Sequence, residues 1–207
     1  MMTRFGCYID GFNLYHALDD LNDEAVKWLD LRALAAHYLP ENAELKRVVY
    51  CTAKNSKHRS AEGKIRHAAY CDALSACGVD VVLGSFAQSP KQCHQCGEVF
   101  QTEEEKQSDL NVALQAIGDV IDGKVDGVCI VSADTDQLAH LRFLRDRFPD
   151  VRRHVLFPPG RSKSKALADL SHESTSIDRY QLRGQRLPNL VQTPNRLVAC
   201  PQQYQLS

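Results

Sequence analysis

The sequence predicts an α/β fold: a doubly wound, mainly parallel sheet of five to six strands with helices on both faces. The first observation is that short runs rich in β-branched residues alternate along the chain with segments of helical spacing. The second is that these runs are apolar throughout, as is typical of parallel strands buried on both faces. Strands are expected at residues 4–10, 45–52, 79–86, 126–133 and 152–158. Helices are expected at about 12–21, 30–38, 59–77, 104–122, 135–147 and 163–170.

Length and composition indicate one compact domain. The chain has 207 residues, of which 43% are hydrophobic. This is enough for one sizeable core and too short for two ordinary domains. We expect the domain to span residues 1–183. Over residues 184–207, three prolines and little periodicity predict an extended arm that packs on the body or on a neighbouring molecule.

Charge is balanced overall but unevenly distributed. The formal net charge of -1 gives no sign of a general nucleic-acid or membrane binder. Residues 1–150 nevertheless hold 16 basic and 23 acidic side chains, whereas residues 151–207 hold 9 and 3. An acidic body could supply metal ligands, and a basic segment could supply phosphate contacts. No apolar run has the length of a membrane span and no signal-like stretch opens the chain, so we expect a cytoplasmic protein.

Acidic side chains follow two of the expected strands. Asp10 ends the strand 4–10, and Asp134 and Asp136 come just after the strand 126–133. Because the carboxyl ends of parallel strands meet at one edge of a sheet, we expect these carboxylates to lie together. Taken singly, each could instead cap a helix or stabilise a turn.

A third acidic segment precedes the strand 126–133. Asp109 is expected near the start of the helix 104–122, on an apolar stripe that buries Leu110 and Leu114, with Glu105 one turn earlier. Several carboxylates at one place repel one another unless a cation neutralises them. Oxygen ligands favour Mg²⁺ or Mn²⁺, which suits phosphodiester hydrolysis because the ion lowers the pKa of an attacking water.

These segments also resemble a known family. The resemblance is carried by YIDGFNLYHAL (8–18), EEEKQSDLNVAL (103–114), CIVSADTDQLAHL (129–141) and VLFPPGRSKSKAL (155–167). In this order they look like the NYN domain of the PIN-like nuclease superfamily, in its bacterial LabA-like branch, over roughly residues 4–180. The resemblance implies a PIN-like fold for residues 1–183 and a metal-dependent ribonuclease that acts on RNA.

The resemblance also implies site residues. The acidic metal-binding residues of the family match Asp10, Asp109, Asp134 and Asp136. The polar partner after the first strand matches Asn13, which we expect in the catalytic set, and the small hydroxyl residue before the acidic pair matches Ser132, which we expect to bind substrate. From its chemistry alone, the Asn13 amide could orient a water or a phosphate, or it could simply cap a helix.

A basic loop leaves the last expected strand at the same edge. It contains a glycine turn, hydroxyl groups and the cations Arg161, Lys163 and Lys165, followed by a helix start. Such a loop could hold a nucleic-acid backbone without reading its sequence. The alternative is that these cations are merely solvated.

Residues 87–103 interrupt the alternation and are expected to form a hairpin insertion. Cys93 and Cys96, followed by glycine, have the spacing of a zinc knuckle. Two thiolates leave the coordination incomplete, and a homodimer is one way to complete it. The candidates within the chain are Cys71, Cys77, His58, His67 and His94. A reduced pair or a redox motif is the alternative.

Two functions from different classes are therefore compared. The first is a ribonuclease that uses Mg²⁺ or Mn²⁺ at the acidic site and carries a structural zinc ion. The second is a PIN-like module that binds RNA or a protein without cleavage. Retention of all four acids argues for the nuclease, because a binding module has no need of clustered negative charge.

Overall fold

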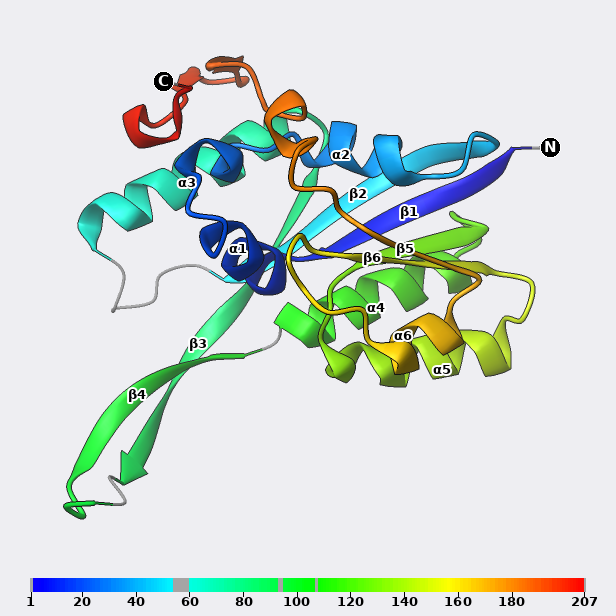
Figure 1. Cartoon of the computed structure of the whole chain (residues 1–207), viewed down its shortest axis with the longest axis horizontal. Coiled ribbons are helices and arrows are strands. Elements are labelled where there is room, and N and C mark those ends of the chain that lie inside the picture. Colours follow the sequence, from blue (N-terminus) through cyan, green and yellow to red (C-terminus); the bar gives the residue numbers. More distant parts are fainter. Residues whose placement is uncertain (1, 54–59, 93–94, 107, 207) are drawn as a thin grey trace.

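The computed structural model describes residues 2–53, 60–92, 95–106 and 108–206, and it has the expected α/β architecture (Figure 1). One sheet has the strand order β4-β3-β2-β1-β5-β6-β7. Six strands run parallel, and β4 is antiparallel to β3. The strands are β1 (Thr3–Asp10), β2 (Ala43–Ala53), β3 (Asp80–Gln92), β4 (Val99–Lys106), β5 (Gly127–Val131), β6 (Arg152–Phe157) and β7 (Glu173–Ser176).

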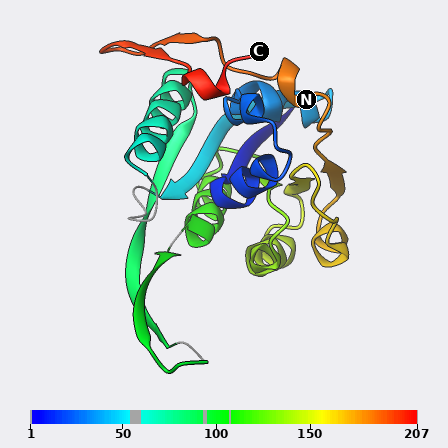
Figure 2. The ribbon, with the colours of Figure 1, turned by 60° about the vertical axis from the view of Figure 1, so that its left-hand side comes forward.

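Helices cover both faces of the sheet (Figures 1 and 2). One face is packed by α1 (Gly11–Asp19), α2 (Leu31–Tyr38), α3 (Ala61–Ala76) and the short helix η1 (Glu24–Lys27). The other face is packed by α4 (Ser108–Ile121), α5 (Leu138–Arg147) and α6 (Lys165–Leu170). Alternate residues of β1 enter opposite cores, with Cys7 and Ile9 on the first face and Tyr8 on the second. Among the described helices, none is both long and apolar enough to cross a membrane.

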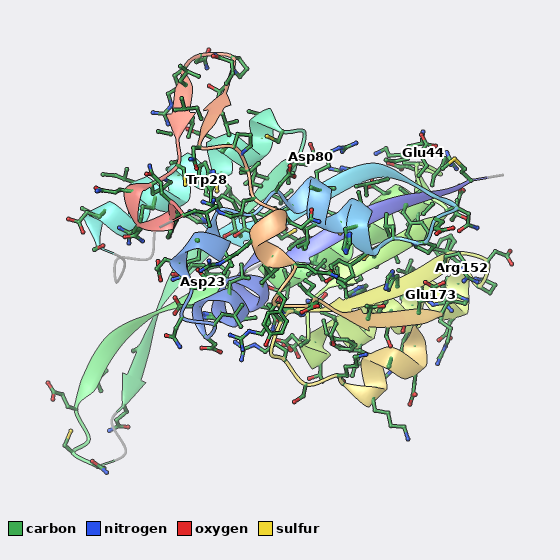
Figure 3. The ribbon with its side chains drawn as sticks, turned by 45° about the horizontal axis from the view of Figure 1, so that its top comes forward. Asp23, Trp28, Glu44, Asp80, Arg152 and Glu173 are labelled. Carbon is green, nitrogen blue, oxygen red and sulfur yellow. The ribbon has the colours of Figure 1, made fainter. Side chains whose placement is uncertain are left out.

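The amino and carboxyl ends of the parallel strands carry different side chains. Arg152 at the start of β6 pairs with Glu173 at the start of β7, 3.2 Å apart, at the amino ends of the strands (Figure 3). Both side chains are about half exposed, so this pair contributes little stability. At the opposite edge β1 ends in Asp10, and the register pairs Ile9 with Val131 at the end of β5. The two central strands therefore deliver their following loops to the same place.

Two predictions are wrong, one about the segment before α4 and one about the buried face of α4. Glu105 lies in β4, opposite Phe86 of β3, and not on the helix. Leu110 and Leu114 are 57% and 55% exposed. The stripe that α4 buries consists of Val112, Ala116 and Val120. Asp109 precedes the first of these by three residues, so it lies at the head of the buried stripe although its neighbouring leucine does not.

The predicted insertion contains an antiparallel pair of strands. β3 and β4 pair from Ser85 with Lys106 to Gln92 with Val99, and they extend well beyond the body of the sheet (Figures 1 and 2). Cys93 lies outside the described residues, so the cysteine pair in the connection is not described as a unit.

The C-terminal segment packs on the body. It contains η3 (Leu182–Gly184), the antiparallel strands β8 (Leu190–Gln192) and β9 (Leu197–Ala199), and η4 (Gln202–Tyr204). Val191, Val198 and Tyr204 belong to the buried core on the α1–α3 face. The indole Nε1 of Trp28 donates a 3.0 Å hydrogen bond to the carbonyl of Pro188. Side chains of residues 184–206 thus contribute to the core.

Candidate functional site

Asp10 is the most buried acid of the site. It ends β1 and is 2% exposed. Asp10 also caps α1, because its Oδ1 accepts a 3.0 Å hydrogen bond from the backbone N–H of Asn13. Its Oδ2 accepts a hydrogen bond from Ser132 Oγ, also at 3.0 Å. Burial raises the pKa of Asp10 to about 6, and the charges of Asp109 and Asp134 add to the rise, while the two hydrogen bonds oppose it.

Hydrogen bonds join the end of β1 and the start of α1 to the loop after β5. The Oδ1 atom of Asn13 accepts a 2.9 Å bond from the N–H of Ala133. Ser132 Oγ, besides donating to the carboxylate of β1, accepts from the N–H of Asp134 at 3.0 Å. Asp134 Oδ1 in turn accepts from the N–H of Asp136 and caps η2 (Thr135–Gln137). Each polar side chain therefore fixes the backbone of its neighbour.

Gly11 allows the start of α1 to pack closely against β2. It follows the first acid directly, and a Cβ at this position would lie 2.6 Å from the carbonyl oxygen of Cys51 and 2.8 Å from the ring of Tyr50. Only a residue without a side chain lets the start of α1 approach β2 this closely. The glycine thus has a steric role beside the site.

Three carboxylates from two segments, the start of α4 and the loop after β5, gather here. Asp109, Asp134 and Asp136 each offer an oxygen, and these oxygens all lie within 4.8 Å of one another. Octahedral coordination at ~2.1 Å places opposite ligands about 4.2 Å apart, so small side-chain movements would let all three bind one ion. The donor set consists of oxygen atoms only, which fits Mg²⁺ or Mn²⁺. Asp10 is not within this triad, but the charges of two of its members, Asp109 and Asp134, contribute to the raised pKa of its carboxyl group.

The sequence analysis missed Gln137 at this site. Its side chain is 1% exposed, and its Nε2 lies 3.5 Å from Asp109 Oδ1. Its Oε1 is buried without a hydrogen-bond partner among the residues that the structure describes. The only sequence signal was its position directly after Asp136. The amide is placed to orient the carboxylate that α4 supplies.

The basic loop is only partly available for a substrate. Arg161 pairs with Asp20 at 2.8 Å. Lys163 and Lys165 are exposed. Ser164 caps α6, which has six residues and is too short for a strong helix dipole. The loop follows β6, the neighbour of β5, and so leaves the sheet at the edge where the carboxylates lie.

The zinc prediction is not supported. Cys93, His94 and His58 lie outside the described residues, and Cys96 is exposed and free of any disulfide. Among the described residues, the acidic triad is the one group with metal-binding geometry. His67 Nε2 lies 3.2 Å from Thr52 Oγ1 and 3.8 Å from Cys71 Sγ, and Cys77 is half-buried.

Comparison with known proteins identifies the family. Residues 4–178 match the NYN domain. The chain belongs to the NYN domain family. This assignment covers β1 to β7 and includes the acidic triad. The family match does not distinguish the LabA-like branch, which stays an expectation from the sequence.

Two relatives place this NYN domain protein among known chains. It is 31% identical to the 6-hydroxy-3-succinoylpyridine 3-monooxygenase HspA of Pseudomonas putida (strain DSM 28022 / S16), over 91% of this chain and 71% of the relative. It is also similar to the crystal structure of VPA0982, a protein of unknown function from Vibrio parahaemolyticus RIMD 2210633. That similarity has a TM-score of 0.52 and 20% identity, over 86% of this chain and 94% of the other. At this identity the second likeness shows the fold alone.

Proposed function

We propose that this NYN domain protein is a metal-dependent ribonuclease that hydrolyses RNA phosphodiester bonds. The observation that carries the proposal is the meeting of Asp109, Asp134 and Asp136, whose oxygens lie within 4.8 Å at the carboxyl edge of the sheet. Family membership supports it, because a nuclease-type hydrolase is what an NYN domain suggests. A divalent ion, Mg²⁺ or Mn²⁺, would be held by this triad, with Asp10 as the buried fourth carboxylate.

The chain supplies binding and orientation. When bound, the ion would lower the pKa of a water and neutralise charge on the phosphate. Asn13 and Ser132 hold the loops that carry the acids, through the backbone of Ala133 and Asp134. Gln137 orients the Asp109 carboxylate. No protein nucleophile is needed in this scheme.

The basic loop supports RNA binding. Lys163 and Lys165 are exposed cations in the loop that leaves the sheet at the edge of the proposed metal site, so they could hold phosphates on either side of the cleaved bond. Arg161 is expected to contribute less, because Asp20 already neutralises it. Contacts of this kind bind the backbone and leave the sequence unread.

The proposal is tested by cleavage of labelled single-stranded RNA with Mg²⁺ or Mn²⁺, using labelled DNA as the comparison substrate. Asp109→Asn and Asp134→Asn should each lower the cleavage rate by at least about 100-fold, since each removes a charged ligand. Asp150→Asn, an exposed acid after α5, is the matched control and should cleave like the wild type. Undiminished cleavage by both site variants, with circular dichroism showing intact folds, would remove the triad from the reaction.

The same assay tests the alternative of a non-cleaving module. That alternative expects the wild type to retain RNA or a protein partner and to leave RNA intact with every divalent ion. The name of the relative HspA describes that protein as a 6-hydroxy-3-succinoylpyridine 3-monooxygenase. We base the proposal for this chain on its carboxylates instead.

A further inference from the structure

A separate cavity of about 230 Å³ lies on the α1–α3 face of the sheet. It is lined by residues of α1, η1, β2 and α3 and by Tyr204 of η4. None of the acidic triad lines it. The cavity is smaller than the roughly 300–1,000 Å³ clefts that hold drug-sized ligands, so it suits a ligand with a single aromatic ring.

Aromatic side chains form much of the wall. Tyr15, Tyr50, Tyr70 and Tyr204 all line the cavity. The rings of Tyr50 and Tyr70 meet edge to face, with centroids 6.0 Å apart at 77°. Several ring faces and edges around one small space favour a planar aromatic guest, because ring pairs gain energy beyond their buried area.

Two cations also line the cavity, and they differ in the partners that the described residues give them. Lys27 is bound by Asp19 and Glu24, each 2.5 Å from its Nζ. Arg66 has no ion pair in the part of the chain that the structure describes, and its Nε is buried there without a hydrogen-bond partner. A buried donor without an acceptor is unfavourable unless a ligand supplies one.

The start of α3 adds to the preference for an anion. Ser60 and Gly63 line the cavity. Ser60 caps α3, because its Oγ accepts a hydrogen bond from the N–H of Gly63. The first turn of this 16-residue helix therefore lies at the cavity wall together with Arg66. The partial positive charge at the N-terminus of the helix and the charge of the guanidinium both favour an anion in the cavity.

We infer that this cavity is a binding site for a single planar aromatic ring that carries an anionic oxygen group, a carboxylate or a phosphate, which Arg66 binds. Two sources share this chemistry: a pyrimidine nucleotide and a free aromatic acid. The site does not depend on the proposed nuclease activity, because its residues and those of the acidic triad are different.

The fluorescence of Trp28 can report binding. It is the single tryptophan of the chain, and its ring lies 5.7 Å from that of Tyr70, which lines the cavity. The protein is titrated with uridine 5′-monophosphate and with benzoate, each in the presence of a chelator. Uridine and benzamide are the uncharged controls. We expect a saturable change for at least one anionic probe and binding weaker by about tenfold or more for its uncharged counterpart.

Variants assign the anion contact. Arg66→Gln should weaken binding of the anionic probe by about tenfold or more and leave binding of the uncharged probe unchanged. Arg147→Gln, an exposed arginine at the end of α5 on the opposite face, is the matched control and should bind normally. Asp134→Asn should also bind normally, which separates this site from the nuclease proposal. Circular dichroism of each variant verifies the fold.

The outcomes separate the sources. Binding of the nucleotide alone makes the cavity a base pocket, binding of benzoate alone makes it a site for small aromatic acids, and both outcomes support the inference. No saturable change with either anion overturns it. Equal affinity of the wild type and Arg66→Gln, or binding of the uncharged probes as tight as that of the anions, also overturns it.

Discussion

Asp10→Asn is expected to make the protein more stable while it removes a carboxylate from the site. Burial, with the nearby charges of Asp109 and Asp134, raises the pKa of Asp10 from 3.8 to about 6 in the folded protein. A shift of this size means that the ionised group costs about 3 kcal/mol of folding free energy at neutral pH. Asparagine can keep both hydrogen bonds, because its Oδ1 can accept from Asn13 and Ser132 Oγ can accept from its amide.

The effect of pH follows from the direction of this shift. Between pH 3.8 and about 6 the folded protein holds a proton on Asp10 that the unfolded chain has released. The contribution of this group to the free energy of unfolding therefore falls as pH rises through that window. Above the window, the ionised carboxylate destabilises the folded state by the full amount. The variant should exceed the wild type in unfolding free energy by up to about 3 kcal/mol at pH 7.5 and by only about 0.5 kcal/mol at pH 4.

Urea unfolding followed by Trp28 fluorescence measures the difference, in a chelating buffer at both pH values. Asp150→Asn serves as the control for removal of an exposed acid. Adding Mn²⁺ should then stabilise the wild type more than Asp10→Asn, because the ion binds only the folded state and prefers the ionised site. If Asp10→Asn is no more stable than the wild type at pH 7.5, or if its advantage does not depend on pH, the proposed cost of this buried charge is wrong.

Three further changes test the surroundings of the site. Ser132→Ala should lower stability by about 1–2 kcal/mol and shift the acidic limb of the cleavage–pH profile upward, because Asp10 loses a hydrogen bond that lowers its pKa; an unchanged profile would contradict this. Gly11→Ala should cost about 1–3 kcal/mol in thermal unfolding, since the new Cβ collides with the β2 backbone, and wild-type stability would refute the close approach. Replacing Lys163 and Lys165 with glutamine should flatten the slope of log affinity for single-stranded RNA against log salt by roughly 1.4, and an equal slope would exclude both from phosphate binding.

The central strands could be predicted because they are buried on both faces. Cys7, Cys129 and their neighbours lie in apolar runs, and these became β1 and β5. β7 could not be predicted in this way, because Glu173–Ser176 is polar and lies at the edge of the sheet, where burial imposes no apolar pattern. The phase of α4 was wrong because Leu110 and Leu114 are the larger apolar residues, yet the sheet accepts the smaller ones.

The positions of the acids follow from topology, whereas their contacts depend on tertiary structure. Asp10 and Asp134 could be placed together because parallel neighbours end at one edge. Asp109 was placed there through a stripe whose assumed members are exposed, so the position was right and its reason was not. Gln137 carries no pattern of its own, and its burial depends on how α4 and η2 meet. Whether the cysteine spacing indicates zinc depends on ligands that the spacing does not contain.

The unequal burial of the acids suggests different tasks. Asp109 and Asp136 are exposed, so they can exchange ions and water without loss of folding free energy. Asp10 is buried and fixed by two hydrogen bonds, and it keeps an ionised form that the fold disfavours. Such a cost is expected where a negative charge must be present before a cation binds. The bound cation then stabilises the ionised carboxylate and offsets the free energy that burial costs. The same reasoning makes Ser132 a positioning residue, because its hydroxyl links the buried acid to the loop that carries the exposed ones.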